Sequence, residues 1–226
     1  MEKFLPIFSK TRLFQGLTGE EIRGMLTCLD VTVKSYDRGA YLLHAGDTSH
    51  AIGLVLSGEV HLTREDFWGN HDLLTAVRAG ETFAEAAALL GDKPLLFEAV
   101  AAEATEAVFF PVNRLIRTCS TNVGCQSLVI ENLLAIVAER NLLYERKCGH
   151  LSHRTTREKL LSFLSEQSAE QNNAEITIPF NRQELADYLS VDRSAMSAEL
   201  SRMQADGLLR YEKSRFLLLK TNTDKP

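Results

Sequence analysis

The chain has 226 residues, of which 45% are hydrophobic and 24% are charged, and its formal net charge is −5. This composition excludes a disordered or fibrous protein, and the length allows one or two hydrophobic cores. Residues 1–149 hold 14 Lys and Arg against 19 Asp and Glu, whereas residues 150–226 hold 11 of each. Neither part has the strongly basic composition of a nonspecific nucleic-acid binder.

No targeting or membrane-spanning segment is predicted. The chain has no run of about 18 apolar residues, and its N-terminus, MEKFLPIFSK, lacks the apolar core of a signal peptide. We therefore expect a cytoplasmic protein without a membrane partner. Thiols rather than disulfides are expected in that compartment at the four cysteines, Cys28, Cys119, Cys125 and Cys148. The spacing of Cys119 and Cys125 leaves a metal site or a redox switch as the alternative.

Short strands separated by glycine turns are predicted in the N-terminal part. Apolar residues alternate with smaller or polar ones in Tyr41 to His44, Ile52 to Leu56, Val60 to Arg64 and Leu73 to Val77. Turn conformations that a Cβ resists are supplied by Gly46, Gly58 and Gly80. A strand rhythm of about ten residues predicts a small β-barrel or sandwich, with Phe67-Trp68-Gly69-Asn70 at the tip of one hairpin.

A long helix is predicted from about Gln126 to Gly149, because this segment has no Pro and no Gly before its end. It carries two apolar stripes. One, spaced alternately by four and three residues, is Ile130, Leu134, Val137, Asn141, Tyr144, Cys148 and Leu151. The other is Val129, Leu133, Ile136 and Leu143. Such a helix is expected to pack on its own barrel and on a second copy of the chain; complete burial in a monomer is the alternative.

The C-terminal part contains repeated helix start signals. Thr155 and Glu158 have capping-box spacing and open a helix, after a hinge at Gly149 to Thr155. Asn181 and Glu184 have the same spacing and open a second, short helix.

The segment after this short helix predicts a helix-turn-helix. After a turn at Ser190-Val191, Asp192 caps a helix whose apolar stripe is Met196, Leu200 and Met203. Two short strands then follow in Gly207 to Leu219, around Lys213-Ser214-Arg215, as in the wing of a winged helix.

The face of the last helix opposite its apolar stripe is expected to meet the major groove of DNA. It carries Arg193, Ser194, Ser197, Ala198, Ser201 and Arg202. Arg193, in the first turn, is predicted to reach a guanine edge, while Arg202 and the hydroxyls hold phosphate. The wing residues Lys213 and Arg215 are expected at the DNA backbone. A helical hairpin that binds only protein is the alternative.

The whole chain resembles the cyclic-AMP receptor protein/FNR (Crp/Fnr) family of bacterial transcription regulators. The resemblance is carried by Leu13-Phe14-Gln15-Gly16-Leu17, Gly53 to Val60, Phe83-Ala84-Glu85-Ala86, Arg157 to Leu164 and Arg182-Gln183-Glu184-Leu185. It implies an α+β chain: a cyclic-nucleotide-binding-like β-barrel (jelly roll) over residues 1–122, a dimerisation helix and hinge over 123–150, and a winged helix-turn-helix over 151–226. It further implies a homodimer on a two-fold symmetric DNA site, a signal held in the barrel, and RNA polymerase as a partner if the protein activates. Arg182 and Gln183 join the expected DNA contacts.

Departures from the family indicate a different effector. Cyclic-nucleotide binders of this family use a Phe-Gly-Glu turn and a later Arg-Ser pair on the phosphate; this chain has Phe83-Ala84-Glu85 and, later, Leu95-Leu96-Phe97. Each lost charge-assisted hydrogen bond costs about 1.5–3 kcal/mol, so cyclic AMP is not the expected effector. The expected pocket suits an apolar or aromatic ligand and consists of Phe83, Leu95, Leu96, Phe97 and Tyr144. Glu85 either organises its turn or contacts the unknown effector.

Metal, cofactor and catalytic sites would leave other patterns in the sequence. An iron–sulfur cluster of the FNR type is not expected, because the first thirty residues contain only Cys28. Haem remains an alternative cofactor, with His44, His50 or His61 as its ligand. No His-x-His pair, nucleophile elbow, P-loop or dinucleotide fingerprint occurs, so an enzyme is not expected. A ligand-binding regulator that acts through protein partners is a further alternative.

The predicted recognition helix also departs from relatives that use Arg-Glu and a later Arg, because the matching positions are Arg193, Ser194 and Ala198. We therefore expect a different operator, a palindrome with half-sites about 10–10.5 base pairs apart.

Overall fold

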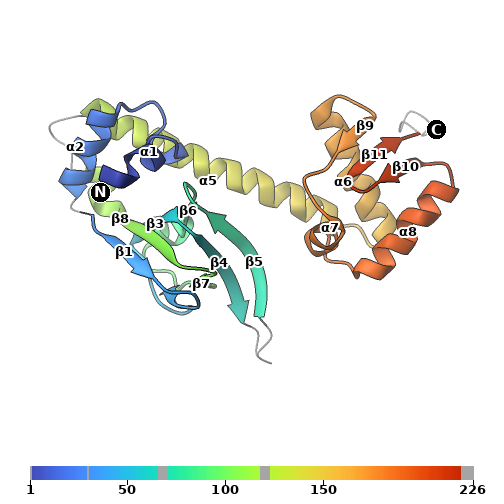
Figure 1. The fold of residues 1–226 in the computed structure, drawn as a ribbon, viewed down its shortest axis with the longest axis horizontal. Helices are drawn as coiled ribbons and strands as arrows, with labels where there is room; N and C mark the ends of the chain where they lie inside the picture. The colour runs from blue at the N-terminus through green and yellow to red at the C-terminus, as the bar shows by residue number, and fades with distance from the viewer. Residues whose placement is uncertain (1, 30, 66–70, 118–122, 220–226) are drawn as a thin grey trace. The chain divides into compact units, whose positions relative to one another are not determined.

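The computed structural model describes residues 2–29, 31–65, 71–117 and 123–219. The chain forms two compact units, Met1–Glu139 and Arg140–Pro226. The long helix α5 (Val123–Leu151) begins in the first unit and ends in the second. Figure 1 shows the elements of both units.

The first unit begins with short helices and continues as a set of strands. Its helical elements before the strands are η1 (Glu2–Phe4), α1 (Leu5–Phe8), η2 (Arg12–Phe14) and α2 (Gly19–Leu29). The strands are β1 (Val33–Tyr36), β2 (Tyr41–Leu43), β3 (Ala51–Ser57), β4 (Glu59–Glu65), β5 (His71–Arg78), β6 (Thr82–Phe83), β7 (Glu98–Ala101) and β8 (Thr105–Pro111). Two short helices, α3 (Glu85–Leu90) and α4 (Val112–Arg117), follow β6 and β8.

The strands form two antiparallel sheets with the orders β1-β8-β3-β6 and β2-β7-β4-β5. They make a jelly-roll sandwich rather than a closed barrel, which corrects the barrel in our expectation (Figure 1). The four predicted strands correspond to β2, β3, β4 and β5. The predicted hairpin tip, Phe67 to Asn70, lies outside the described residues.

One core of the first unit includes Phe83 and residues from both sheets. Its buried members are Val55, Val60, Leu62, Val77, Phe83, Ala84 and Ala99. The ring of Phe83 lies directly on the backbone of Gly53, where an added Cβ would collide with the ring. The same ring meets Phe109 edge to face, with centroids 5.7 Å apart. A glycine in β3 therefore makes room for the ring that fills this part of the core.

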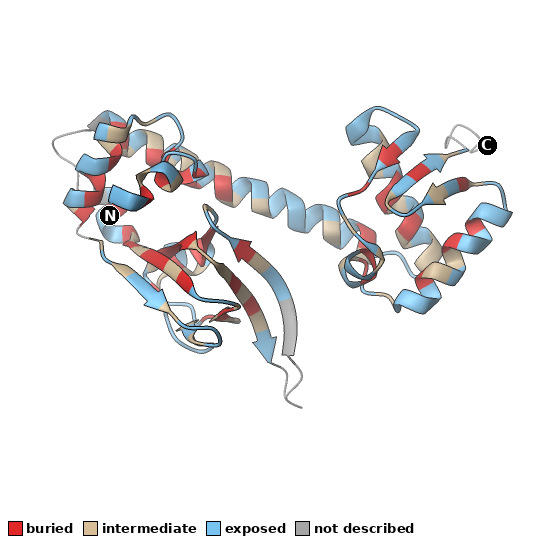
Figure 2. Ribbon diagram, in the orientation of Figure 1, coloured by how far each residue is buried: buried red, intermediate tan, exposed pale blue. Residues whose placement is uncertain are grey.

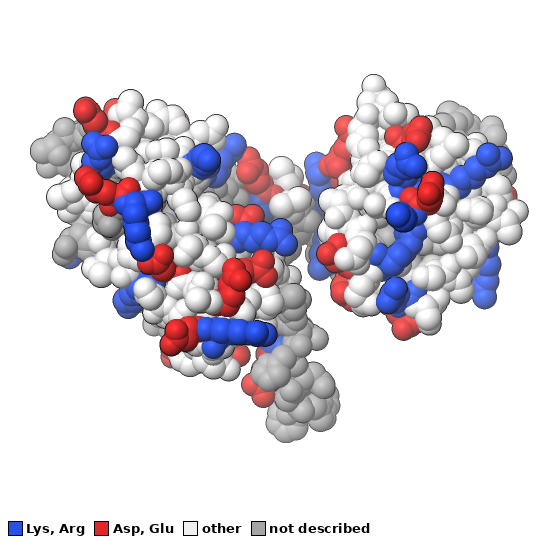
Figure 3. Space-filling model, viewed as in Figure 1, with Lys and Arg blue, Asp and Glu red and all other residues white. Residues whose placement is uncertain are grey.

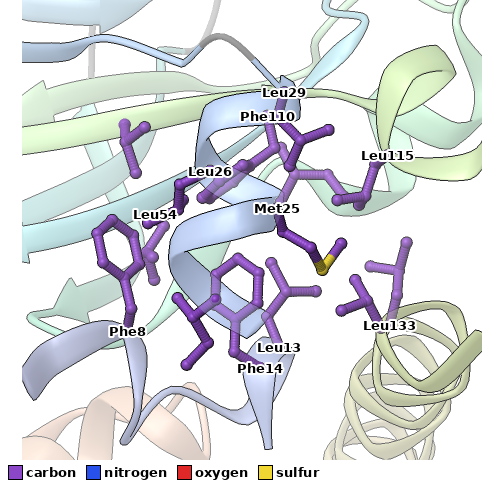
Figure 4. Close-up of a cluster of buried hydrophobic side chains, with 14 of the residues drawn as sticks. Phe8, Leu13, Phe14, Met25, Leu26, Leu29, Leu54, Phe110, Leu115 and Leu133 are labelled. Atoms are coloured by element: carbon purple, nitrogen blue, oxygen red, sulfur yellow. The ribbon is translucent and has the colours of Figure 1, made fainter. Parts of the chain in front are cut away.

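A second core joins the N-terminal helices to β3, β8 and α5. Phe8, Phe14 and Phe110 are fully buried and pack edge to face, with centroids 5.6–6.4 Å apart (Figure 4). The α5 stripe Val129, Leu133 and Ile136 belongs to this core. One of the two predicted stripes is thus buried within the first unit.

The other predicted stripe of α5 is largely uncovered. Leu134 and Tyr144 are each 63% exposed, and buried residues occupy one side of the N-terminal half of the helix (Figure 2). Leu143, the last residue of the stripe that begins at Val129, is 61% exposed, because the core of the first unit extends along α5 only as far as Ile136 and Val137.

The second unit is a winged helix-turn-helix. Its elements after α5 are α6 (Thr156–Gln171), β9 (Glu175–Thr177), α7 (Arg182–Tyr188), α8 (Arg193–Ala205), β10 (Leu209–Glu212) and β11 (Arg215–Leu218). The strands form an antiparallel sheet in the order β10-β11-β9. Leu160, Leu185, Leu200 and Phe216 belong to its single buried cluster. The predicted helices and wing are confirmed.

Two further expectations concern the chain as a whole. None of the helices in the described ranges is long and apolar enough to span a bilayer. Among the described cysteines, Cys28, Cys125 and Cys148 form no disulfide, and Cys119 lies outside the described residues.

We predict that Gly53→Ala destabilises the first unit by about 1–3 kcal/mol, because the added methyl collides with the Phe83 ring. Urea unfolding of the purified protein measures the change. Combining Gly53→Ala with Phe83→Leu should recover part of the loss. Gly24→Ala is the matched control: apart from neighbouring backbone of its own helix, no described heavy atom lies within 4 Å of its added methyl, so it should be neutral or stabilise α2. Equal effects of the two alanines would contradict the close approach.

Candidate DNA-binding surface and effector region

A capping box opens α7 at the edge of the candidate surface. Asn181 Oδ1 accepts hydrogen bonds from the backbone N–H groups of Gln183 (2.8 Å) and Glu184 (3.0 Å). In return, the Asn181 N–H donates to Glu184 Oε2 (2.7 Å). The helix ends before Ser190, whose φ of 50° lies in the left-handed region and turns the chain towards α8. The predicted cap and turn are both present.

Asp192 begins α8 and thereby sets where the recognition helix starts. Its Oδ1 accepts from Ser194 Oγ (2.5 Å) and from the Ala195 N–H (2.8 Å). These bonds, the serine first, lower the pKa of Asp192 below its ordinary value. Asp192 therefore stays ionised as the cap at neutral pH.

One face of α8 is fully buried and the opposite face is open. Met196, Leu200 and Met203 are 0% exposed. The predicted DNA-facing residues that are exposed are Arg193, Ser194, Ala198, Ser201 and Arg202, while Ser197 is half-buried. The burial of the apolar stripe thus turns the predicted set towards solvent.

Two of the serines on this face are bonded to their own helix. Ser197 Oγ donates to the Arg193 carbonyl (2.9 Å), and Ser201 Oγ donates to the Ser197 carbonyl (3.1 Å). Because a hydroxyl has one proton, neither retains a donor for a phosphate oxygen in this arrangement. These serines would therefore contribute through their small size, which allows the helix backbone to approach a ligand closely.

The wing is a tight hairpin beside these helices. Lys213 and Ser214 connect β10 to β11, and Lys213 adopts a φ of 54°. The Ser214 carbonyl accepts from the Ile178 N–H (2.9 Å), which ties the hairpin to the segment before α7. Arg215 lies 3.4 Å from Glu212 in an exposed ion pair.

A pocket of about 590 Å³ lies where the starts of both helices meet the tip of the wing. It is lined by Asn181, Arg182, Gln183, Arg193, Lys213 and Ser214. Three of these side chains are cations and none is a carboxylate. The pocket is therefore suited to an anion. It brings together four residues predicted from the sequence, whereas Asn181 was predicted only as a cap and Ser214 only as part of the wing.

Arg182 lies in this pocket in a way that the sequence did not predict. Its guanidinium carbon is 4.7 Å from the Tyr211 ring centroid and 5.0 Å from that of Phe216. Burial lowers the pKa of Arg182 below its ordinary value. Its Nη2 atom is buried and, among the described residues, meets no hydrogen-bond acceptor. The two aromatic rings hold the guanidinium in a fixed place beside the pocket.

Outside this pocket, several arginines of the second unit already have acidic partners. Arg202 Nη1 lies 3.1 Å from Glu199, and Arg157 contacts both Glu199 and Asp206. Basic and acidic side chains are intermingled on the face of this unit seen in Figure 3. The equal numbers of basic and acidic residues in residues 150–226 thus include ion pairs between neighbouring side chains.

The predicted effector residues fall into three different environments. Phe83 and Leu95 are buried, and Phe97 packs against the core that contains Phe83. Leu96 is 77% exposed. Tyr144, also exposed, belongs to the second unit. The structure brings Phe83 and Phe97 together but places Leu96 at the surface.

The turn before α3 contains a left-handed residue that has a Cβ. Ala84 has a φ of 63°, in the left-handed region where the family pattern has glycine. Adopting this conformation costs a residue with a Cβ roughly 1–2 kcal/mol. Glu85 begins α3 and is only 2% exposed. It is therefore part of the interior of the first unit.

The three histidines considered for haem are engaged or exposed at separate places. The His44 ring stacks on Tyr41 with centroids 4.7 Å apart, and His61 Nε2 lies 2.9 Å from Glu59. His50 is exposed. Within the described ranges, no three His, Cys, Asp or Glu side chains are grouped so as to hold a metal ion.

Two family models match the chain. Residues 33–122 match the cyclic nucleotide-binding domain, and residues 158–222 match the Crp-like helix-turn-helix domain. The chain belongs to the Crp/Fnr family. It is a DNA-binding transcription regulator, with a domain of the cyclic-nucleotide-binding type before its DNA-binding domain.

Solved structures share this fold. The c-di-GMP responsive global regulator CLP of Xanthomonas campestris is 18% identical, with 90% of this chain and 100% of that chain covered and a TM-score of 0.58. CprK in complex with OCPA is 16% identical, with 89% and 90% covered and a TM-score of 0.63. A putative cAMP-binding regulatory protein from Silicibacter pomeroyi DSS-3 is 21% identical, with 97% and 95% covered and a TM-score of 0.53. No functionally curated protein matches the chain.

We predict that Asn181→Ala destabilises the second unit by about 1 kcal/mol, because two backbone N–H groups of α7 lose their acceptor. Thermal unfolding followed by circular dichroism measures the loss. Asn181→Asp, which keeps an acceptor oxygen at the cap, is the control and should retain most of the stability. An alanine variant as stable as the wild type would show that the cap contributes nothing.

Proposed function

We propose that the protein acts as a homodimer on a palindromic operator, with α8 in the major groove and the pocket and wing on the DNA backbone. An effector other than cyclic AMP, held in the jelly roll, controls this binding. The observation that carries the proposal is the pocket of about 590 Å³, in which Arg182, Arg193 and Lys213 converge without a carboxylate.

Arg193 is the residue best suited to read a base. It occupies the first turn of α8, is exposed, and has no acidic partner among the described residues. The guanidinium is therefore available for two hydrogen bonds to a guanine in the major groove. Ser194 and Ala198, on the same exposed face, are small enough to let the helix backbone approach the base edges.

The remaining predicted contacts are assigned to the DNA backbone. Arg182, Gln183 and Lys213 line the pocket, so one phosphate can receive donors from α7 and from the wing. Arg215 would exchange its exposed partner Glu212 for phosphate, whereas Arg202, which is 71% exposed, would reach a phosphate with its remaining donors while Nη1 stays on Glu199. Ser197 and Ser201 contribute small surface rather than donors, because their protons are bonded to the helix.

The homodimer is supported by the uncovered stripe of α5. Leu134 and Tyr144 are each 63% exposed, at positions of the same heptad pattern. An isolated chain would expose this apolar surface to water, whereas a second copy would cover it. Two copies related by a two-fold axis then require a two-fold symmetric DNA site.

The proposed effector differs from cyclic AMP because the segment at the family's phosphate-binding position is apolar. Leu95 is buried, Leu96 is exposed and Phe97 packs towards the core, so none of the three offers a cation to a phosphate. Phe83 already fills the space above Gly53. An apolar or aromatic effector is therefore favoured. Where the protein activates transcription, RNA polymerase is its second macromolecular partner.

Selection of duplexes from a random DNA library by the purified protein tests the proposed function. The expected product is an inverted repeat whose half-sites are about 10–10.5 base pairs apart. Native mass spectrometry of the complex should give two chains per duplex. Failure to enrich any sequence, with intact folding, would favour the alternative regulator that acts through protein partners.

We predict that Arg193→Ala weakens binding to the selected duplex by about 1–3 kcal/mol and relaxes the preference at one base pair of each half-site. Fluorescence anisotropy with the selected duplex and its single-base variants gives both quantities. Arg193→Lys keeps the charge without the guanidinium fork, so it should restore affinity for random DNA but not the base preference. Unchanged affinity in Arg193→Ala would remove Arg193 from base reading.

We predict no saturable binding of cyclic AMP by isothermal titration calorimetry up to millimolar nucleotide, because the segment Leu95 to Phe97 offers no guanidinium. A cyclic-AMP receptor protein titrated in the same buffer is the positive control. Saturation at micromolar nucleotide would overturn the proposed effector class.

A further inference from the structure

The first turn of α6 holds both helices of the helix-turn-helix. Lys159 Nζ donates to the Leu189 carbonyl (3.1 Å) at the end of α7. Arg157, two residues earlier, reaches α8 instead. One turn of one helix thus carries two cations, each directed at a different element of the DNA-reading motif.

Arg157 contacts α8 at two points separated along the helix. Its Nε lies 2.5 Å from Glu199 Oε1, and its Nη2 lies 2.6 Å from Asp206 Oδ2. Asp206 is the C-terminal cap residue of α8. Because the guanidinium is planar and rigid, two such contacts restrict both rotation of α8 about its axis and movement along it.

Glu199 passes this restraint on to the exposed face of α8. Its side chain is only 13% exposed and contacts Arg157 on one side and Arg202 Nη1, at 3.1 Å, on the other. Arg202 itself is 71% exposed. The carboxylate therefore connects a cation of α6 to a cation on the proposed DNA-facing surface.

The apolar stripe beneath α8 does not by itself fix the rotation of the helix strictly. Two of its three fully buried side chains, Met196 and Met203, are unbranched and flexible. Methionine fills a core well but specifies position less strictly than branched side chains do. A polar contact with fixed geometry can accordingly refine the rotational setting that this packing leaves to α8.

We propose that Arg157 is a positioning residue for sequence reading: through Glu199 and Asp206 it fixes the rotational setting of α8 at which Arg193 and Arg202 meet the operator. This inference rests on the proposed function, since it assumes that α8 reads DNA. Arg157 is engaged with two carboxylates, so its loss affects recognition of sequence more than general attraction to DNA.

The test compares the selected duplex with a random duplex of equal length. In Arg157→Met, which keeps the aliphatic stem, we expect the ratio of the two affinities to fall about tenfold, with affinity for random DNA changed less than about twofold. Glu199→Gln should reduce the same ratio. Adding Arg157→Met to Glu199→Gln should lower it by less than about threefold further, because the two residues act through one contact.

Two controls keep the outcomes separate. Arg78→Met removes one positive charge and an exposed ion pair with Glu59 in the first unit, and should leave the ratio unchanged. Arg157→Lys keeps the charge without the two-point contact, and should give an intermediate ratio in a stably folded protein. If urea unfolding shows that Arg157→Met does not fold, the affinity ratio of Arg157→Lys tests the positioning role instead.

Each result has a distinct meaning. A wild-type protein that does not distinguish the duplexes contradicts the proposed function itself. If the wild type does distinguish them, the positioning role is overturned by an unchanged ratio in Arg157→Met and Arg157→Lys, by equal losses on both duplexes, or by fully multiplicative effects in the double variant.

Discussion

The burial of one face of α8 is the constraint on which the proposed DNA-reading surface depends. Met196, Leu200 and Met203 are fully buried, and each such side chain contributes about 1.5–3 kcal/mol relative to exposure. A helix fixed on this side presents the opposite side to solvent, so Arg193 and Ala198 are exposed as a consequence of packing. The capping bonds of Asp192 and the ion pairs of Arg157 then refine a position that the core has already chosen.

The same principle distinguishes the two sides of α5. Val129 and Leu133 are buried in the core of the first unit, whereas Leu134 remains 63% exposed on a neighbouring position. A helix with one buried and one exposed apolar stripe can pack on its own unit with the first and on another surface with the second. Phe83, unlike Leu134, is covered by residues of its own unit, because it contacts Gly53 and Phe109.

Features encoded within a few residues were predictable from the sequence. The capping boxes at Thr155 and Asn181 need partners only three residues away, and the recognition helix follows from its own spacing. The strand β7 was not predicted, because two of its four residues are alanine and its pairing comes from distant β2 and β4. The stacking of Arg182 on the wing also depends on residues that are distant in sequence. Exposure of Leu96 beside buried Leu95 likewise reflects tertiary packing.

The pairing of arginines in the second unit affects how the protein is distributed in a cell. Arg146, Arg157, Arg202 and Arg215 all have carboxylate partners in the described structure, whereas the cations that line the pocket are not engaged in this way. Attraction to arbitrary DNA grows with each phosphate that a protein neutralises. An arginine that is already paired with a carboxylate contributes less to this attraction, so the four pairs reduce retention by the rest of the chromosome. Fewer copies are then sequestered, and a small number of molecules suffices to occupy a small number of promoters.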